Sequence, residues 1–159
     1  MKILIVSDTH KHEENLKKVL KRIGEIDCFI HLGDSEGREG YIKRLIDCQS
    51  YFVAGNNDYF SDLDRELEIQ LGDFDVLLTH GHQYQVEFTS EHVADEARDR
   101  GMHIVMYGHT HRPSIDYFDD VVALNPGSLS YPRQDGRRAS FIIMEIDKRG
   151  DYHFTVNYV

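Results

Sequence analysis

The chain has no tryptophan, and only two cysteines and three prolines, among its 159 residues. The cysteines, Cys28 and Cys48, lie in apolar or helical surroundings without C-x-x-C spacing, which predicts two reduced thiols instead of a disulfide. The sequence also lacks an early apolar segment with a small-residue cleavage site, and no apolar run is long enough to span a bilayer. We therefore expect a cytoplasmic protein without a membrane partner.

Basic residues are scarce relative to acidic ones. There are 18 lysines and arginines against 28 aspartates and glutamates, for a formal net charge of −10. Such a charge repels phosphate backbones at long range. We therefore expect no stable nucleic-acid binding, and an exonuclease is less expected because no basic stripe is present to hold a strand.

The composition is that of a globular protein, with 40% hydrophobic and 29% charged residues. The length is sufficient for one domain with a substantial core. No repeat, low-complexity tract or linker interrupts the chain, which predicts one domain over residues 1–159.

Hydrophobic periodicity predicts βα units in the first two-thirds and a β meander in the last third. Helices are predicted at 13–25, 40–47 and 90–100, the last one capped by Thr89 or Ser90. Strands are predicted at 3–6, 28–32, 51–54, 67–71, 76–78, 103–107, 115–118, 121–124, 140–146 and 152–158. This mixture predicts two sheets packed face to face with helices outside.

The first predicted strand, at 3–6, is followed directly by Asp8-x-His10. In open α/β sheets the chemistry lies just past the carboxyl ends of the strands. On an extended segment, two residues at this spacing point to the same side. Aspartate and histidine are both good ligands for a divalent metal of borderline hardness.

The same pattern recurs at the ends of five predicted strands. In chain order these ends carry Asp8 and His10, Asp34, Asn56, His80, and His109 with His111. Seven ligands exceed the four that a structural zinc takes. They suit two divalent ions about 3.5–4 Å apart that share a bridging carboxylate, a device for in-line displacement at phosphorus.

The set of motifs resembles the calcineurin-like metallophosphoesterases from Ser7 to Ser128. The residues that carry the resemblance are Asp8-x-His10, Gly33-Asp34, Gly55-Asn56, His80 and Gly108-His109-x-His111. The small size, the Ser-Asp-Thr-His opening and the loop of Asn125, Pro126, Gly127 and Ser128 look most like the compact bacterial and archaeal phosphodiesterases. The retromer subunit of eukaryotes shares their fold.

The resemblance implies an α/β protein, a four-layer αββα sandwich of two mixed β-sheets flanked by helices. It implies two divalent metal ions per chain, with Mn²⁺ first and Ni²⁺, Zn²⁺ or Fe as alternatives. One metal would take Asp8, His10 and His111, the other Asn56, His80 and His109, with Asp34 bridging. A bridging water or hydroxide would attack a small phosphodiester or nucleotide-like substrate, so no side-chain base is needed.

One position departs from the superfamily pattern, in which a histidine usually follows the ligand asparagine. Here that residue is Asn57. We assign Asn57 and Asp34 as catalytic residues, but an amide donates a hydrogen bond and cannot supply a proton at neutral pH. The sequence therefore predicts slow turnover and a preference for good leaving groups, and it leaves Asp58 as a turn residue.

Several other polar residues have more ordinary interpretations. We expect His31 to be a buried histidine that either supports a metal ligand or belongs to the core. We expect His82 to be a hydrogen-bonded loop histidine and Ser7 a strand-end hydroxyl with local hydrogen bonds. Turn chemistry alone explains the residue types of the loop Asn125-Pro126-Gly127-Ser128. The resemblance also implies that Asn125, Gly127 and Ser128 lie beside the site and that their backbone helps position a phosphate. The predicted basic substrate contacts are Arg133 and then Arg112.

Two other functions use the same residues. A metal-binding protein-interaction scaffold of the retromer-subunit kind would keep the fold without catalysis, and a phosphomonoesterase or nucleotidase would differ only in pocket shape. The aromatic final strands, with Tyr152, Phe154 and Tyr158, leave internal packing and a homodimer or higher homo-oligomer face as alternatives.

Overall fold

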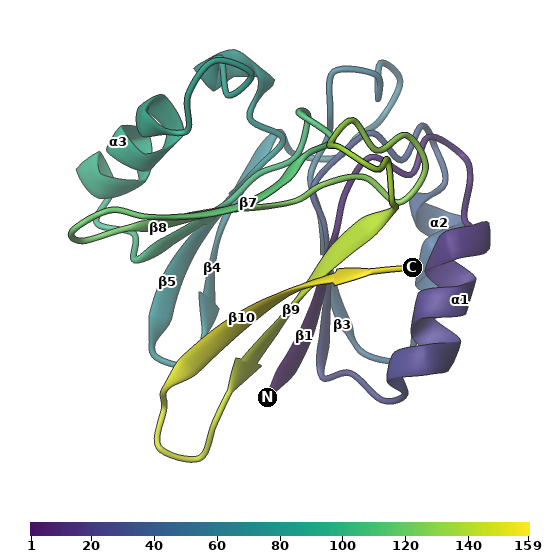
Figure 1. Ribbon diagram of the computed structural model, residues 1–159, viewed down its shortest axis with the longest axis horizontal. Coiled ribbons are helices and arrows are strands. Elements are labelled where there is room, and N and C mark those ends of the chain that lie inside the picture. Colours follow the sequence, from purple (N-terminus) through teal and green to yellow (C-terminus); the bar gives the residue numbers. More distant parts are fainter.

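The computed structural model describes residues 1–159, and its helices and strands form four layers, with two sheets between helices (Figure 1). The first sheet contains, in spatial order, β10 (Tyr152–Tyr158), β9 (Ser140–Ile146), β1 (Lys2–Val6), β2 (Cys28–His31) and β3 (Gln49–Phe52). The second contains β4 (Glu66–Leu71), β5 (Phe74–Thr79), β6 (Ile104–Met106), β8 (Val122–Pro126) and β7 (Pro113–Tyr117). Each sheet contains two parallel and two antiparallel strand pairings. The predicted αββα sandwich of mixed sheets is confirmed.

Strand β1 shows why the first apolar run has no polar alternation. Ile3 and Ile5 point into the central core between the two sheets, whereas Leu4 and Val6 point to the opposite face. That outer face packs against α1 (Glu14–Ile23) and α2 (Glu39–Lys43). A strand covered on both faces needs apolar residues at every position.

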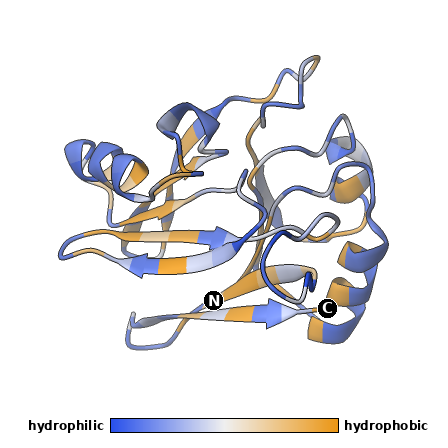
Figure 2. Ribbon diagram, turned by 45° about the horizontal axis from the view of Figure 1, so that its top comes forward, coloured by the Kyte–Doolittle hydropathy of each residue, from blue (hydrophilic) through white to orange (hydrophobic).

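The second sheet repeats this arrangement with a single helix outside. Val76 and Leu78 of β5 enter the central core, and Leu77 packs outward against α3 (Glu91–Asp99). The buried face of α3 includes Val93 and Ala97. Figure 2 shows that hydrophobic residues concentrate on the strands and on the helix faces turned toward them.

Most predicted elements differ by a residue or more at their ends in the structure, and two of these differences have an identifiable cause. The helix predicted at 40–47 ends at Lys43, because the chain continues in tight turns in which Arg44 and Leu45 donate to carbonyls three residues earlier. The strand predicted at 51–54 is Gln49–Phe52, since the Ala54 N–H leaves the ladder and donates to Asp64 O. Polar residues at the start of this edge strand gave no hydrophobic signal.

Three smaller findings complete the fold. Ser90 precedes α3 without a capping side-chain hydrogen bond, since its hydroxyl donates to Asp116, so the predicted cap is wrong for this residue. Tyr152 and Phe154 pack against the central core, with Tyr152 in edge contact with Phe74.

None of the helices combines the length and the apolar character that a membrane crossing requires. The loops after the parallel strands gather at the top of Figure 1.

Candidate metal centre

The structure brings the seven predicted ligands together where these loops meet. Asp8 Oδ1 lies 3.0 Å from His111 Nε2 and 3.8 Å from His10 Nε2. The two imidazole nitrogens are 3.4 Å apart. These three residues therefore form one compact group of potential ligand atoms.

A second group lies beside the first, and Asp34 lies between them. Asn56 Oδ1 is 3.0 Å from His80 Nε2 and 3.0 Å from His109 Nδ1. Asp34 Oδ2 is 3.5 Å from His80 Nε2 and 3.7 Å from His10 Nε2. The Asp34 carboxylate thus lies within 3.7 Å of a histidine nitrogen of each group.

The orientation of three histidines fixes which of their ring nitrogens carries a proton. Each Nδ1 faces an oxygen: His10 faces Glu36 Oε1 at 2.7 Å, His80 faces Leu32 O at 2.6 Å, and His111 faces Tyr131 O at 2.7 Å. Carbonyl and carboxylate oxygens only accept, so Nδ1 donates and, in the neutral imidazole, each Nε2 keeps a lone pair. These lone pairs point at other acceptor oxygens.

Such a convergence of acceptors is unfavourable unless positive charge lies between them. Asp8 Oδ1 is buried and receives no hydrogen bond of acceptable geometry. An ionised, unpartnered carboxylate among imidazole lone pairs fits a bound divalent cation.

The backbone at the site is unusual as well. Five of the seven ligands have positive φ angles without being glycine: Asp8 (54°), His10 (43°), Asp34 (58°), His109 (69°) and His111 (58°). This conformation is uncommon for residues with a side chain, and it concentrates at functional sites. It lets the chain turn sharply at the strand end while the side chain points back to the centre.

Glycines next to the ligands make room for the close approach of the loops. A Cβ atom on Gly55 would overlap the Asp34 carboxylate. One on Gly108 would overlap the Ser7 hydroxyl and lie 3.0 Å from Asp8 Oδ2. The small residues noted in the sequence therefore have a steric reason.

Comparison with known proteins agrees with this geometry. The family profile described as "Calcineurin-like phosphoesterase superfamily domain" matches residues 1–149. The chain belongs to this superfamily. It is a metal-dependent phosphoesterase by family, and the residue groups above are its candidate metal ligands.

Two curated relatives are similar to this chain over most of their length. The probable metallophosphoesterase YsnB of Bacillus subtilis is 34% identical over 149 residues, which cover 92% of this chain and 85% of that protein. The phosphodiesterase MJ0936 of Methanocaldococcus jannaschii is 30% identical over 146 residues, which cover 80% of this chain and 83% of that protein.

Two solved structures share the fold over nearly the whole chain. A predicted phosphoesterase from Streptococcus pneumoniae superposes with a TM-score of 0.82 at 31% identity, covering 99% of this chain and 88% of that one. Vps29 of Entamoeba histolytica superposes with a TM-score of 0.80 at 25% identity, covering 100% of this chain and 99% of that one.

Asp58 has a larger role in this phosphoesterase than the turn residue that we expected, so that expectation is wrong. Its buried carboxylate accepts hydrogen bonds from the backbone N–H groups of Asp34 (2.7 Å), Glu36 (2.5 Å) and Gly55 (2.8 Å). It thereby holds the two ligand-bearing loops together. The signal in the sequence was only its position three residues after Gly55.

Asn57 contacts the candidate bridging ligand. Its backbone N–H donates to Asp34 Oδ1 at 2.8 Å, and its side-chain amide donates to Asp34 Oδ2 at 2.6 Å. The amide nitrogen has two N–H donors, so one stays available for a substrate oxygen.

The loop predicted to position a phosphate forms hydrogen bonds to the backbone of the loops that carry the ligands. Asn125 belongs to the end of β8, and its side-chain amide donates to Gly108 O at 2.6 Å. The Ser128 hydroxyl donates to Asp8 O at 2.8 Å. Asn125, Gly127 and Ser128 are buried, so in this structure they face the ligand loops rather than the solvent from which a substrate enters.

The remaining polar residues fall into two kinds. His31 is buried, contacts the Thr9 hydroxyl and stacks on Phe52, and the Ser7 hydroxyl donates to Leu32 O. Both fulfil their expected structural roles. The expectation for His82 is wrong, because its buried Nδ1 has no hydrogen-bond partner.

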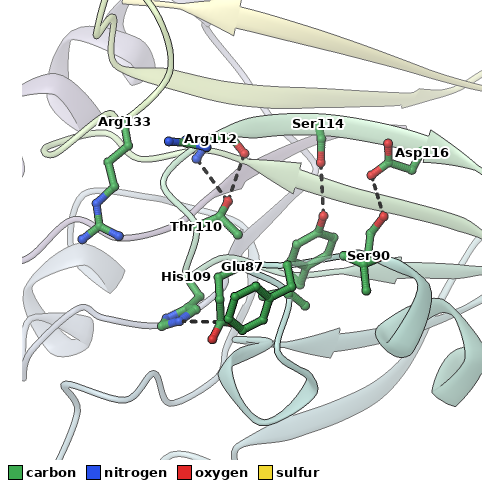
Figure 3. A pocket seen from close by; sticks show the side chains of 12 residues that line it. Glu87, Ser90, His109, Thr110, Arg112, Ser114, Asp116 and Arg133 are labelled. Carbon is green, nitrogen blue, oxygen red and sulfur yellow. Dashed lines mark hydrogen bonds and ion pairs between the residues drawn. The ribbon is translucent and has the colours of Figure 1, made fainter.

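A pocket of about 410 Å³ opens beside His109. In Figure 3, Arg133 and Arg112 lie at one side of it and Ser114 and Asp116 at the other. Glu87 Oε2 is 3.8 Å from His109 Nε2. The two predicted basic contacts therefore border the ligand cluster.

Proposed function

We propose that the protein is a phosphodiesterase that holds two divalent cations, with Mn²⁺ as the first candidate and Ni²⁺, Zn²⁺ or Fe as alternatives. The observation that carries this proposal is the convergence of acceptor atoms without hydrogen between them. One cation would be held by Asp8, His10 and His111, and the second by Asn56, His80 and His109. Asp34 would serve both.

The chemistry supplied by such a pair is charge neutralisation at a phosphate and activation of water for in-line attack at phosphorus. The chain's own residues orient the reaction. The hydrogen bonds from Asn57 fix the rotation of the Asp34 carboxylate, and those from Asp58 fix the loop that carries it. The second N–H of the Asn57 amide would donate to a phosphoryl oxygen.

No histidine is present at position 57 to protonate a leaving alkoxide, so esters with poor leaving groups should turn over slowly. Asn57→His should raise kcat on an alkyl phosphodiester by at least ~100-fold, the lower end of the usual effect of general acid catalysis. The same change should alter the rate on a p-nitrophenyl ester much less. An unchanged alkyl diester rate would refute this role.

Phosphodiester specificity is supported by the name of the M. jannaschii relative. A second candidate function, a metal-binding scaffold for other proteins, is favoured by the full-length likeness to Vps29. A phosphomonoesterase would use the same ligands, so the ratio of diester to monoester hydrolysis distinguishes it.

The test is hydrolysis of bis-p-nitrophenyl phosphate by chelator-treated protein, with and without Mn²⁺, next to p-nitrophenyl phosphate. Asp34→Asn is the variant and Asp62→Asn, on an exposed loop position, is the matched control. Mn²⁺-dependent diester cleavage that is lost only in Asp34→Asn supports the proposal. Bound metal without activity, also with Ni²⁺ or Zn²⁺, would favour the scaffold.

A further inference from the structure

A second hollow, of about 610 Å³, shares Arg112 and Arg133 with the pocket of Figure 3. Its seven lining residues are His10, His111, Arg112, Tyr131, Pro132, Arg133 and Arg137. Two of them are candidate metal ligands and three are arginines. The lining contains no carboxylate.

The three arginines have no acidic partners. No aspartate or glutamate forms an ion pair with Arg112, Arg133 or Arg137, whereas Arg98 and Arg100 pair with carboxylates elsewhere on the surface. In a chain with a net charge of −10, three unpaired guanidinium groups around one hollow create a local positive potential. Such a site attracts an anion.

The hollow is attached directly to the ligand cluster. The backbone N–H of Arg133 donates to the backbone carbonyl of His111 at 3.0 Å, and the backbone carbonyl of Tyr131 accepts from His111 Nδ1 at 2.7 Å. The Tyr131 ring also packs edge-on against His10, with centroids 5.3 Å apart. An anion bound there would therefore lie at a fixed place relative to the scissile phosphate.

The pocket beside His109 differs in charge. It shares Arg112 and Arg133 but also contains Glu87 and Asp116 (Figure 3). Two carboxylates repel a phosphate dianion, so this pocket suits the less charged part of a substrate. The second hollow, with Arg137 and without acidic residues, suits the more charged part.

Building on the phosphodiesterase function proposed above, we propose that the arginine-lined hollow binds a second phosphate group of the substrate. The substrate class is then a phosphodiester that also bears a phosphomonoester, as in a nucleoside esterified at one hydroxyl and phosphorylated at another. Guanidinium groups bind the oxygens of a phosphomonoester in pairs, with charge-assisted hydrogen bonds.

The direct test is binding, which needs no turnover. Thymidine 3′,5′-bisphosphate and thymidine 5′-monophosphate would be titrated calorimetrically into Mn²⁺-loaded and chelator-treated protein. We expect the bisphosphate to bind at least ~10-fold more tightly, the lower value for a hydrogen bond between charged groups. Arg137→Gln should remove most of this ratio, and the control Arg149→Gln, in the β9–β10 turn, should leave it unchanged.

A ratio near one in the unmodified protein, or a ratio unaffected by Arg137→Gln, would overturn the proposal. A kinetic arm compares kcat/KM for the p-nitrophenyl ester of thymidine 5′-phosphate with that of its 3′-phosphorylated counterpart. If both esters resist cleavage while the binding ratio holds, the phosphodiesterase function fails and the subsite stands. If both are cleaved at equal kcat/KM and the binding ratio is one, the subsite fails and the function stands.

Discussion

The role of Asp58 leads to a quantitative prediction. In Asp58→Ala, the backbone N–H groups of Asp34, Glu36 and Gly55 lose their common acceptor. Each buried donor left unpaired costs about 1–3 kcal/mol. Water entering the vacated space and relief of charge repulsion with Asp34 offset part of the sum. We expect the free energy of unfolding to fall by roughly 3 kcal/mol, at the low end of the total for three donors.

The assay is thermal and urea unfolding in the presence of a chelator, so that metal binding does not contribute. For a chain of this size, ~3 kcal/mol corresponds to a decrease in Tm of about 6–12 °C. Asp62→Ala is the matched control, because Asp62 is exposed and lies in the same loop. Asp58→Asn, which keeps one acceptor oxygen, should fall between the two.

Metal affinity gives an independent measurement. Because Asp58 holds the loops of Asp34 and Gly55 together, Asp58→Ala should weaken Mn²⁺ binding at temperatures where the variant remains folded. If Asp58→Ala matches Asp62→Ala in both Tm and Mn²⁺ affinity, the reasoning about shared acceptors is refuted.

Three further predictions concern the core, a glycine and the cations. Burial lowers the pKa of His31 from 6.5 to about 4, so between these pH values the unfolded chain binds a proton that the folded chain does not, and the free energy of unfolding falls by about 3 kcal/mol as the pH drops. In urea unfolding from pH 7 to 4, His31→Leu should lose less stability than the unmodified protein. An identical dependence of stability on pH in the two proteins would contradict this. Gly55→Ala, whose Cβ would overlap the Asp34 carboxylate, should weaken Mn²⁺ binding at least ~10-fold in a titration, which equals the loss of about one hydrogen bond to a charged group. Gly40→Ala, where a Cβ meets nothing within 4 Å, should leave Mn²⁺ binding unchanged. Mn²⁺ at 100 times its Kd should stabilise the chelator-treated protein by about 2.7 kcal/mol, and a Tm that does not change on its addition would argue against cation binding.

The sequence predicts the layers well because both sheets have strands buried on two faces, and continuous apolar runs such as 3–6 reveal them. Edge strand β3 begins two residues earlier than predicted because its first residues are polar. Edge positions depend on backbone pairing, which leaves little trace in hydrophobicity.

The candidate ligands could be found because they follow strand ends, but their supports could not. Asp58 and Glu36 act through hydrogen bonds to loops distant in sequence, and neither shows a pattern that separates it from a surface acid. The burial of Asn125 and Ser128 depends on how β8 passes beneath the ligand loops. Such relations arise only when the two sheets are packed together.

Each group of ligands combines residues from both sheets: Asp8, Asp34 and Asn56 follow strands of the first sheet, and His80 and His109 follow strands of the second. Over most of their area the sheets meet through apolar side chains, whose contacts have no preferred direction. A cation held by either group would therefore tie the two sheets together at one end. Its loss would free that end to open or slide, so the mechanical stiffness of the whole sandwich would depend on its smallest component.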